Sequence, residues 1–285
     1  MNNLLPSVSW VDASWLKNHL EQDITILDVQ PDIHDYIKEH IPGAVYFNED
    51  HLRAYHNNLP SHYIPQQCLQ QLLQSVGLHK NKSVAVYGSN GRFSGKGDGL
   101  EQTMVAYSLA RFGHSNILIL NGGLESWIDA GFPLSKQYPQ VSISEYHPSV
   151  KNDLFVNYNQ FMEIKDSHDT ILIDVRPRSV YQGAGLWEKP GHIPGAINLP
   201  WRLLMDHNNP RMLRVETTIK ELALSRGASP DKTIILYCGT GREATAAFLV
   251  FKYVLSYPKV KLYEGSFTEW VTYPQNQTVT GAKPY

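Results

Sequence analysis

The chain has 285 residues, of which 42% are hydrophobic and 18% are charged, so it can bury a sizeable core and is not a disordered segment. Its net charge of −2 lacks the basic excess typical of nucleic-acid-binding and membrane-surface proteins. Two cysteines are too few for a disulfide framework, and no run of ~18 apolar residues predicts a membrane span. Since the first ten residues, MNNLLPSVSW, lack an export signal, we expect a cytoplasmic chain with no nucleic-acid or membrane partner.

Four short motifs occur twice in the chain, in the same order. The pairs are ILDV (26–29) and LIDV (172–175), HIPGA (40–44 and 192–196), VAVYG (84–88) and IILYC (234–238), and LNGGLESW (120–127) and YEGSFTEW (263–270). Chance similarity between short apolar strings would not preserve this order, so the pattern indicates a tandem duplication. We expect one domain over residues 1–140 and a second over 150–285, joined by a polar linker that contains two prolines.

Apolar runs that predict strands alternate with amphipathic stretches that predict helices. In chain order, strands are expected at 26–29, 84–88, 170–175, 233–238 and 260–263, and helices at 65–78 and 242–255. This alternation predicts an α/β fold in each half, with a parallel sheet flanked by helices on both faces. Functional sites in such sheets form at the carboxyl ends of the strands. Cys68 lies within the helix at 65–78, away from any such end, and we interpret it as a packing residue.

Cys238 stands where a predicted strand gives way to a predicted helix, in YCGTGREAT (237–245). Gly239 and Gly241 allow backbone conformations closed to other residues, so several N–H groups can turn inward. The helix start adds unpaired N–H groups and the positive end of its dipole, and Arg242 adds a fixed charge. We therefore expect the Cys238 thiol to have a lowered pKa and to act as a nucleophile, rather than as a structural cysteine.

The first half lacks this nucleophile, because the position that corresponds to Cys238 is Gly88. We therefore expect the first domain to be catalytically silent and the second to be catalytic. Arg176 follows a strand-end aspartate where the first half has Gln30, and this asymmetry makes Arg176 a candidate pocket residue. Trp187 also occurs only in the second half, where it either lines a pocket or covers a loop. The histidines show no zinc-binding spacing, so we expect no metal.

Two long motifs and the cysteine loop share features with one known family. YIKEHIPGA (36–44) is similar to an N-terminal signature in which an aromatic residue and three variable positions precede HIPGA. VKLYEGSFTEW (260–270) is similar to a C-terminal signature, and the loop after Cys238 is similar to a six-residue active-site loop. These features resemble the rhodanese family of sulfurtransferases over nearly the whole chain. The resemblance implies two tandem rhodanese-like domains, an inert one followed by an active one.

The resemblance also implies a double-displacement reaction that needs no metal and no organic cofactor. A small-molecule donor gives its sulfane sulfur to the thiolate of Cys238, and the persulfide passes it to a thiophilic acceptor such as cyanide, a thiol or a protein. Backbone N–H groups of the loop would hold the persulfide in the manner of an oxyanion hole. The expected substrate-binding residues are Gly239, Thr240, Gly241, Arg242, Glu243, Ala244 and Arg176.

The loop sequence leaves two sulfur donors open, thiosulfate and 3-mercaptopyruvate. The first four positions of CGTGRE resemble the mercaptopyruvate type, whereas Arg242 and Glu243 depart from both types. Where both types carry a Gly-Arg-aromatic string, this chain has Ser179-Val180-Tyr181, so the usual donor-anchoring arginine is missing. Arg242 or Arg176 can take its place, and we favour thiosulfate as the donor.

Two functions of other classes compete with sulfur transfer. A cysteine-dependent phosphatase needs five residues between its cysteine and arginine, but only three separate Cys238 from Arg242, which makes the loop too small for a phosphomonoester. A sulfur carrier or binding module would load Cys238 and pass the sulfur only to a protein partner. Steady turnover with cyanide distinguishes the enzyme from the carrier.

Overall fold

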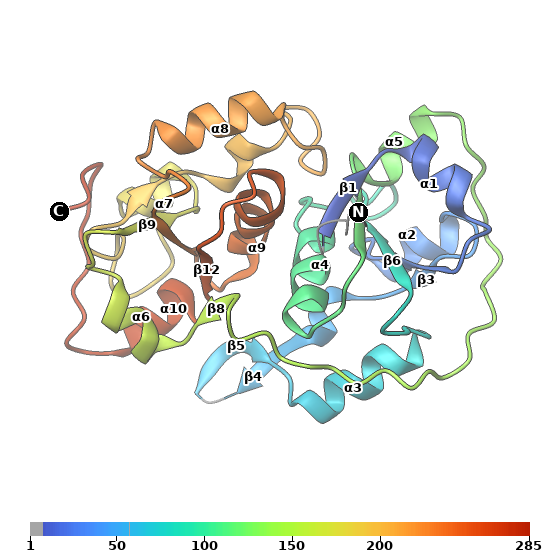
Figure 1. Ribbon diagram of the computed structural model, residues 1–285, viewed down its shortest axis with the longest axis horizontal. Coiled ribbons are helices and arrows are strands. Elements are labelled where there is room, and N and C mark those ends of the chain that lie inside the picture. Colours follow the sequence, from blue (N-terminus) through green and yellow to red (C-terminus); the bar gives the residue numbers. More distant parts are fainter. Residues whose placement is uncertain (1–7, 57) are drawn as a thin grey trace. The chain divides into compact units, whose positions relative to one another are not determined.

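The computed structural model describes residues 8–56 and 58–285 (Figure 1). The first seven residues, on which the expectation about an export signal partly rests, lie outside the described part. The chain divides into two compact units. Unit 1 comprises Met1–Ala54, Tyr63–Lys151 and Asn208–Leu213, and unit 2 comprises Tyr55–His62, Asn152–His207 and Arg214–Tyr285.

Unit 1 is built on a five-stranded parallel sheet with the order β1-β7-β6-β2-β3. α1 and α5 pack on one face in a core that includes the fully buried Trp127, and α3 and α4 lie on the other face (Figure 1). A short ribbon of β4 and β5 follows η1 in the chain. The strands are β1 (Val8–Val11), β2 (Ile24–Asp28), β3 (Val45–Tyr46), β4 (Arg53–His56), β5 (Leu59–Tyr63), β6 (Ser83–Tyr87) and β7 (Ile117–Leu120). The helices are α1 (Ala13–His19), α2 (Ile33–Lys38), η1 (Glu49–Leu52), α3 (Gln66–Ser75), α4 (Glu101–Arg111) and α5 (Gly123–Asp129).

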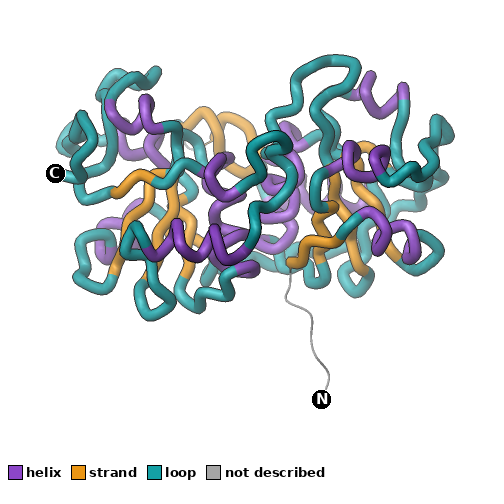
Figure 2. The backbone as a smooth tube through the Cα atoms, turned by 90° about the horizontal axis from the view of Figure 1, so that it is seen from above, coloured by secondary structure: helices purple, strands orange, loops and turns teal. Residues whose placement is uncertain are grey.

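Unit 2 has a second five-stranded parallel sheet, with the order β10-β9-β11-β12-β8. α6 and α10 pack on one face around Phe161 and Trp270, and α8 and α9 lie on the other face (Figure 1). Figure 2 shows the strands of each five-stranded sheet gathered in one group, with helices around it. The strands are β8 (Phe155–Val156), β9 (Thr170–Asp174), β10 (Ile197–Asn198), β11 (Thr233–Tyr237) and β12 (Val260–Tyr263). The helices are α6 (Tyr158–Ile164), α7 (Arg178–Gln182), η2 (Trp201–Leu204), α8 (Glu216–Leu224), α9 (Arg242–Leu249), η3 (Val250–Val254) and α10 (Ser266–Thr272).

The two sheets have the same topology. Read from its far edge, the second sheet runs β8-β12-β11-β9-β10, which matches β1-β7-β6-β2-β3 strand for strand. The expected α/β fold, with helices on both faces of a parallel sheet in each half, is therefore confirmed. β11 ends at Tyr237, which places Cys238 directly after the central strand of its sheet.

Two details differ from the expectations. The helix expected over 242–255 is α-helical only to Leu249 and continues as the π-helical turn η3. The interpretation of Cys68 as a packing residue is wrong, because its side chain is exposed on α3. The buried stripe of α3 is formed by Leu69 and Leu73, and the position before Leu69 is rotated by about 100° from that stripe.

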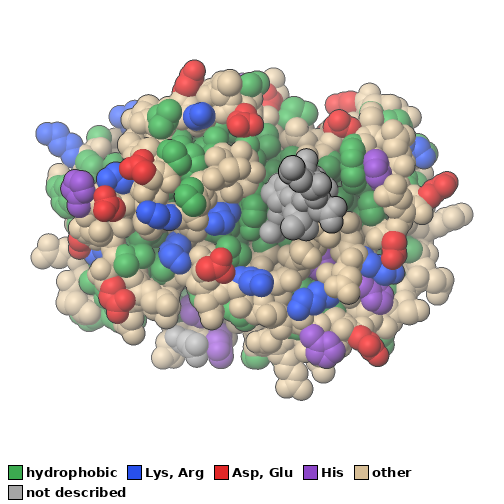
Figure 3. Space-filling model, viewed as in Figure 1, with side chains coloured by type: hydrophobic (Ala, Val, Ile, Leu, Met, Phe, Trp, Pro, Cys, Tyr) green, Lys and Arg blue, Asp and Glu red, His purple; other side chains and the backbone are tan. Residues whose placement is uncertain are grey.

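The charged side chains on the face shown in Figure 3 are of both signs and are interspersed, which agrees with the small net charge. No helix within the described residues is both long enough and apolar enough to cross a membrane.

A buried aspartate ends the strand next to the central strand in each sheet. Asp174 accepts hydrogen bonds from the backbone N–H and the guanidinium of Arg176. Asp28 accepts hydrogen bonds from the side chain and the backbone N–H of Gln30 and from the hydroxyl of Tyr87. Burial raises the pKa of Asp28 to about 6 in spite of these hydrogen bonds.

We expect this carboxyl group to make unit 1 more stable as the pH falls. A group whose pKa is higher in the folded state than in the unfolded chain penalises folding above its folded pKa, and the penalty fades as the pH drops through about 6. Asp28→Asn removes the titration, so the melting temperature of the wild type relative to this variant should rise between pH 7.5 and pH 5. Over this pH range the penalty should fall by about 1.4 kcal/mol, because only about one pH unit of the range lies below the folded pKa. A difference in melting temperature that stays constant across this range would contradict the prediction.

Candidate active site

Three adjacent strands of unit 2 bring the site together at their carboxyl ends. β9, β11 and β12 are neighbours in the sheet, and Arg176, Cys238 and Ser266 lie in the segments that follow them. Carboxyl ends of parallel strands share one edge, so residues that are far apart in the sequence meet there.

The loop after β11 directs backbone N–H groups at the sulfur of Cys238. Gly241 has a φ of 86°, a left-handed conformation that favours glycine, and its N–H donates to Sγ over 3.2 Å. The N–H groups of Thr240 and Ala244 also face the sulfur, and both act to lower its pKa. The loop therefore forms the amide cradle that the sequence predicts, and α9 begins within it at Arg242.

The start of α10 fixes the cysteine from the neighbouring strand end. The N–H of Phe267 donates to the carbonyl oxygen of Cys238, and the N–H of Thr268 donates to that of Gly239, both over 3.0 Å. Ser266 has a φ of 53°, uncommon for a residue with a side chain. Its hydroxyl accepts the N–H of Cys238 over 3.2 Å and donates to the carbonyl oxygen of Tyr263.

The expectation of a lowered thiol pKa is wrong for this structure. The Cys238 side chain is only 1% exposed, and burial raises the pKa of its thiol to about 11. The negative charge of Glu243 raises it further, whereas the N–H groups of the loop lower it without offsetting the loss of solvent. The sequence pattern identified the hydrogen-bond donors but carried no information about how deeply the sulfur lies.

Trp187 covers the loop from the side of α10. A β-carbon placed on Gly239 would lie 2.8 Å from two carbons of the Trp187 ring, so the indole rests directly on the loop backbone. Its Nε1 donates to the hydroxyl of Thr268 over 2.9 Å, and its ring packs edge-on against Phe267. Of the two interpretations that the sequence left open, covering a loop describes Trp187 in this structure.

Arg176 lies beneath this cover and is itself 1% exposed. Its guanidinium binds Asp174 and donates to the carbonyl oxygen of Gly191, and it stacks 4.1 Å from the ring of Phe267. Its Nη1 finds no hydrogen-bond partner among the described residues. Arg176 thus brings a buried positive charge to the same strand ends as Cys238, while most of its donors are already used within the protein.

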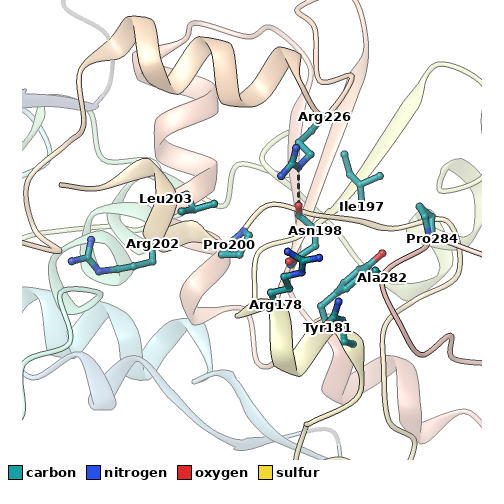
Figure 4. Close-up of a pocket in the computed structure, with 11 residues that line it drawn as sticks. Arg178, Tyr181, Ile197, Asn198, Pro200, Arg202, Leu203, Arg226, Ala282 and Pro284 are labelled. Carbon is teal, nitrogen blue, oxygen red and sulfur yellow. Dashed lines mark hydrogen bonds between the residues drawn. The ribbon is translucent and has the colours of Figure 1, made fainter. Parts of the chain in front are cut away.

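Unit 2 also contains a cavity of about 560 Å³, shown in Figure 4. It is lined by α7, β10, η2 and the C-terminal segment, with Arg178 and Arg226 on either side of Asn198 (Figure 4). None of its lining residues belongs to the 238–244 loop, so this cavity is separate from the candidate active site.

Sequence reasoning missed Ser266 and Phe267, which hold the backbone of the cysteine. A signal for Ser266 existed, because YEGS in the second half stands where the first half has LNGG. The serine replaces a glycine at a position with positive φ in both halves, since Gly123 has a φ of 68°. A side chain that persists in an unfavourable conformation suggests a use for that side chain.

We expect alkylation of Cys238 by iodoacetamide to accelerate with pH, by about tenfold per unit, until the pH approaches 11. Glu243→Gln removes a charge that raises the thiol pKa, so it should speed alkylation at pH 8 by about two- to tenfold. Both rates are measured by mass spectrometry in a Cys68→Ser background, because Cys68 is exposed.

Glu216→Gln is the matched control, since Glu216 occupies the first turn of α8 as Glu243 occupies the first turn of α9. It should leave the rate unchanged. A rate that levels off near pH 8.5 would show that the thiol pKa is not raised.

Gly239→Ala should destabilise the loop, by about 1–3 kcal/mol, because the added methyl group would overlap the Trp187 ring. Trp187→Leu removes the overlapping ring atoms, so the double variant should lose less stability than the sum of the two single variants. Thermal unfolding of the four proteins in this cycle measures the coupling. Strict additivity would mean that the indole does not rest on Gly239.

Comparison with known proteins identifies the family. Residues 12–130 and 157–273 each match the family model of the rhodanese-like domain. A Synechococcus elongatus protein named "Putative thiosulfate sulfurtransferase" is 34% identical over 273 residues, which cover 93% of this chain and 83% of that protein. The sulfur carrier protein TtuD of Thermus thermophilus is 28% identical over 279 residues, which cover 91% of this chain and 92% of TtuD.

A solved structure agrees with these relatives. SseA from Escherichia coli, described with the rhodanese fold and the mechanism of 3-mercaptopyruvate sulfotransferases, matches with a TM-score of 0.79 and 27% sequence identity. The match covers 90% of this chain and 98% of SseA. Since the family model matches both halves and most of the residues, the chain belongs to the rhodanese family of sulfurtransferases.

Proposed function

We propose that this protein moves a sulfane sulfur from thiosulfate to a thiophilic acceptor through a persulfide on Cys238. The observation that carries the proposal is the set of loop N–H groups around Sγ, with that of Gly241 3.2 Å away, at the carboxyl end of the central strand. Such a cradle stabilises a sulfur anion as an oxyanion hole stabilises an oxygen anion. The similarity to the Synechococcus elongatus protein favours thiosulfate, and the similarity to SseA keeps 3-mercaptopyruvate as the alternative donor.

The chemistry requires that the thiol first lose its proton. The Cys238 thiolate then attacks the outer sulfur of thiosulfate, a new S–S bond forms, the S–S bond of thiosulfate breaks, and sulfite leaves with the electron pair. Attack by cyanide on the outer sulfur of the persulfide gives thiocyanate and returns the thiolate. With 3-mercaptopyruvate the C–S bond breaks instead, and the enolate of pyruvate leaves and takes up a proton.

The raised thiol pKa makes the stability of the persulfide anion important for the reaction. Burial opposes the anion, so few resting molecules carry a thiolate at neutral pH. In the persulfide the negative charge sits one bond farther from the buried β-carbon, on a sulfur that is inherently more acidic than a thiol. We propose that the loop, from Gly239 to Ala244, stabilises this outer sulfur with its N–H groups, and that Arg242 attracts the anionic donor.

We assign different roles to the two remaining candidates for substrate binding. Glu243 raises the thiol pKa and repels an anionic donor, so it restrains the reaction instead of binding the donor. Arg176 acts through its charge from beneath Trp187, because burial and its bonds to Asp174 and Gly191 separate it from solvent. The first domain, which has a glycine at position 88, is proposed to be catalytically silent.

A second candidate function is that of a sulfur carrier for a protein acceptor. The similarity to TtuD favours it, because that relative is named a sulfur carrier protein and matches over 91% of this chain. The two functions share the persulfide and differ in whether a small thiophile releases the sulfur. We further propose a cytoplasmic location, since an exposed free thiol such as that of Cys68 suits a reducing compartment.

The decisive measurement is the intact mass after incubation with each donor. We expect a gain of one sulfur atom per chain with thiosulfate, its loss in Cys238→Ser, and its retention in Cys68→Ser. Addition of cyanide should return the mass to its starting value and yield thiocyanate in repeated cycles.

Other outcomes discriminate between the alternatives. A gain only with 3-mercaptopyruvate would change the donor, and loading without release to cyanide would favour the carrier. If neither donor adds sulfur, or if Cys238→Ser still gains it, the proposed function is wrong.

A further inference from the structure

The first half retains the backbone frame of the catalytic site without its cysteine. The N–H of Leu124 donates to the carbonyl oxygen of Gly88 over 2.9 Å, as the N–H of Phe267 donates to that of Cys238. Gly123 has a positive φ at the position of Ser266. Gly88 therefore stands in unit 1 where Cys238 stands in unit 2.

In unit 1, side-chain oxygens of the protein accept the N–H groups around this position. The N–H of Gly88 donates to Gln102 Oε1 over 3.2 Å, and the N–H of Asn90 donates to Glu125 Oε1 over 2.8 Å. Farther along the loop, the N–H groups of Asp98 and Gly99 donate to the carboxylate of the buried Glu101. An amide oxygen and two carboxyl groups of the protein thus accept N–H groups in the loop of unit 1 that follows the position of the cysteine.

Arg211 completes this arrangement and is 4% exposed. Its Nε donates to Glu125 Oε2 over 3.0 Å, and its Nη1 donates to the carbonyl oxygen of Ser89 over 3.2 Å. A β-carbon added to Gly88 would lie 3.9 Å from Arg211 Cδ, and one added to Gly123 would lie 2.7 Å from it. The β-carbon added to Gly123 would also lie 2.6 Å from the carbonyl oxygen of Gly88, so this oxygen and the arginine stem together leave no room for a side chain at position 123, whereas its counterpart Ser266 has one.

Arg211 belongs to the segment Asn208–Leu213, which lies between η2 and α8 in the sequence but is part of unit 1. Other groups of this segment also form hydrogen bonds with unit 1. The N–H of Gly122 and the side chain of Gln102 both donate to the carbonyl oxygen of Arg211. The N–H of Leu213 donates to Asn121 Oδ1 over 2.9 Å, and Asn209 donates to the carbonyl oxygen of Gly122 over 2.8 Å.

We propose that the strand-end loops around Gly88, the position in the first half that corresponds to Cys238, form a socket for residues 208–213, with Arg211 as the inserted side chain and Glu125 as its counter-ion. The occupant is a named segment of the same chain, and the hydrogen bonds above define its position. The silent domain consequently holds a loop that the second half of the sequence supplies. This inference does not depend on the chemistry of Cys238.

Hydrogen–deuterium exchange of the full chain tests the socket, with the N–H groups of Gly122 and Leu213 as reporters. Arg211→Ala removes the buried guanidinium that binds Glu125 and the carbonyl oxygen of Ser89, so exchange at both reporters should accelerate by about tenfold or more. Amides of α9 serve as the internal reference and should not change. Arg214→Ala is the matched control, because no described residue forms an ion pair or a hydrogen bond with the Arg214 side chain.

Glu125→Gln provides a second variant in case Arg211→Ala does not fold. The amide oxygen can still accept the N–H of Asn90, while the charge that holds Arg211 is gone. Exchange should therefore accelerate at Gly122 and Leu213 and change less at Asn90. The proposal is overturned if either folded variant leaves Gly122 and Leu213 as protected as in the wild type, or if Arg214→Ala exposes them equally.

Discussion

The hydrogen bond between the first turn of α10 and the end of β11 is the constraint on which the site depends. The N–H of Phe267 donates to the carbonyl oxygen of Cys238, so this bond joins the segments that follow two adjacent parallel strands at the candidate cysteine. The same bond between Leu124 and Gly88 exists in the half without a cysteine. The bond is therefore a property of the fold, and the two halves differ in what surrounds it.

Desolvation and amide hydrogen bonding oppose each other at Cys238, and desolvation dominates in the resting protein. An exposed cysteine in the same loop would ionise more readily, but its persulfide would also meet water and stray thiols. Trp187 rests on the loop backbone at Gly239, next to this buried cysteine. Glu243, in the first turn of α9, also raises the thiol pKa.

Local patterns predicted the features that depend on local physics. Apolar runs located the strands around Asp174, Tyr237 and Tyr263, and glycine spacing located the loop that presents N–H groups to Cys238. The direction of the shift in the thiol pKa was not predictable, because it depends on burial, to which segments distant in the sequence such as the start of α10 contribute. The exposure of Cys68 was not predicted. The helix is amphipathic, but the sequence did not show that its buried stripe runs through Leu69 and Leu73 and leaves the preceding position exposed.

The inclusion of Asn208–Leu213 in unit 1 means that the two modules of this protein overlap along the chain. A hybrid could be made by joining the first half of one family member to the second half of another. In such a hybrid, the socket and the segment 208–213 that fills it would come from different proteins. Compatibility at Glu125 and Arg211 would then influence whether such a hybrid folds, although both positions lie outside the catalytic loop. Recombination between relatives is expected to favour junctions that carry both positions together.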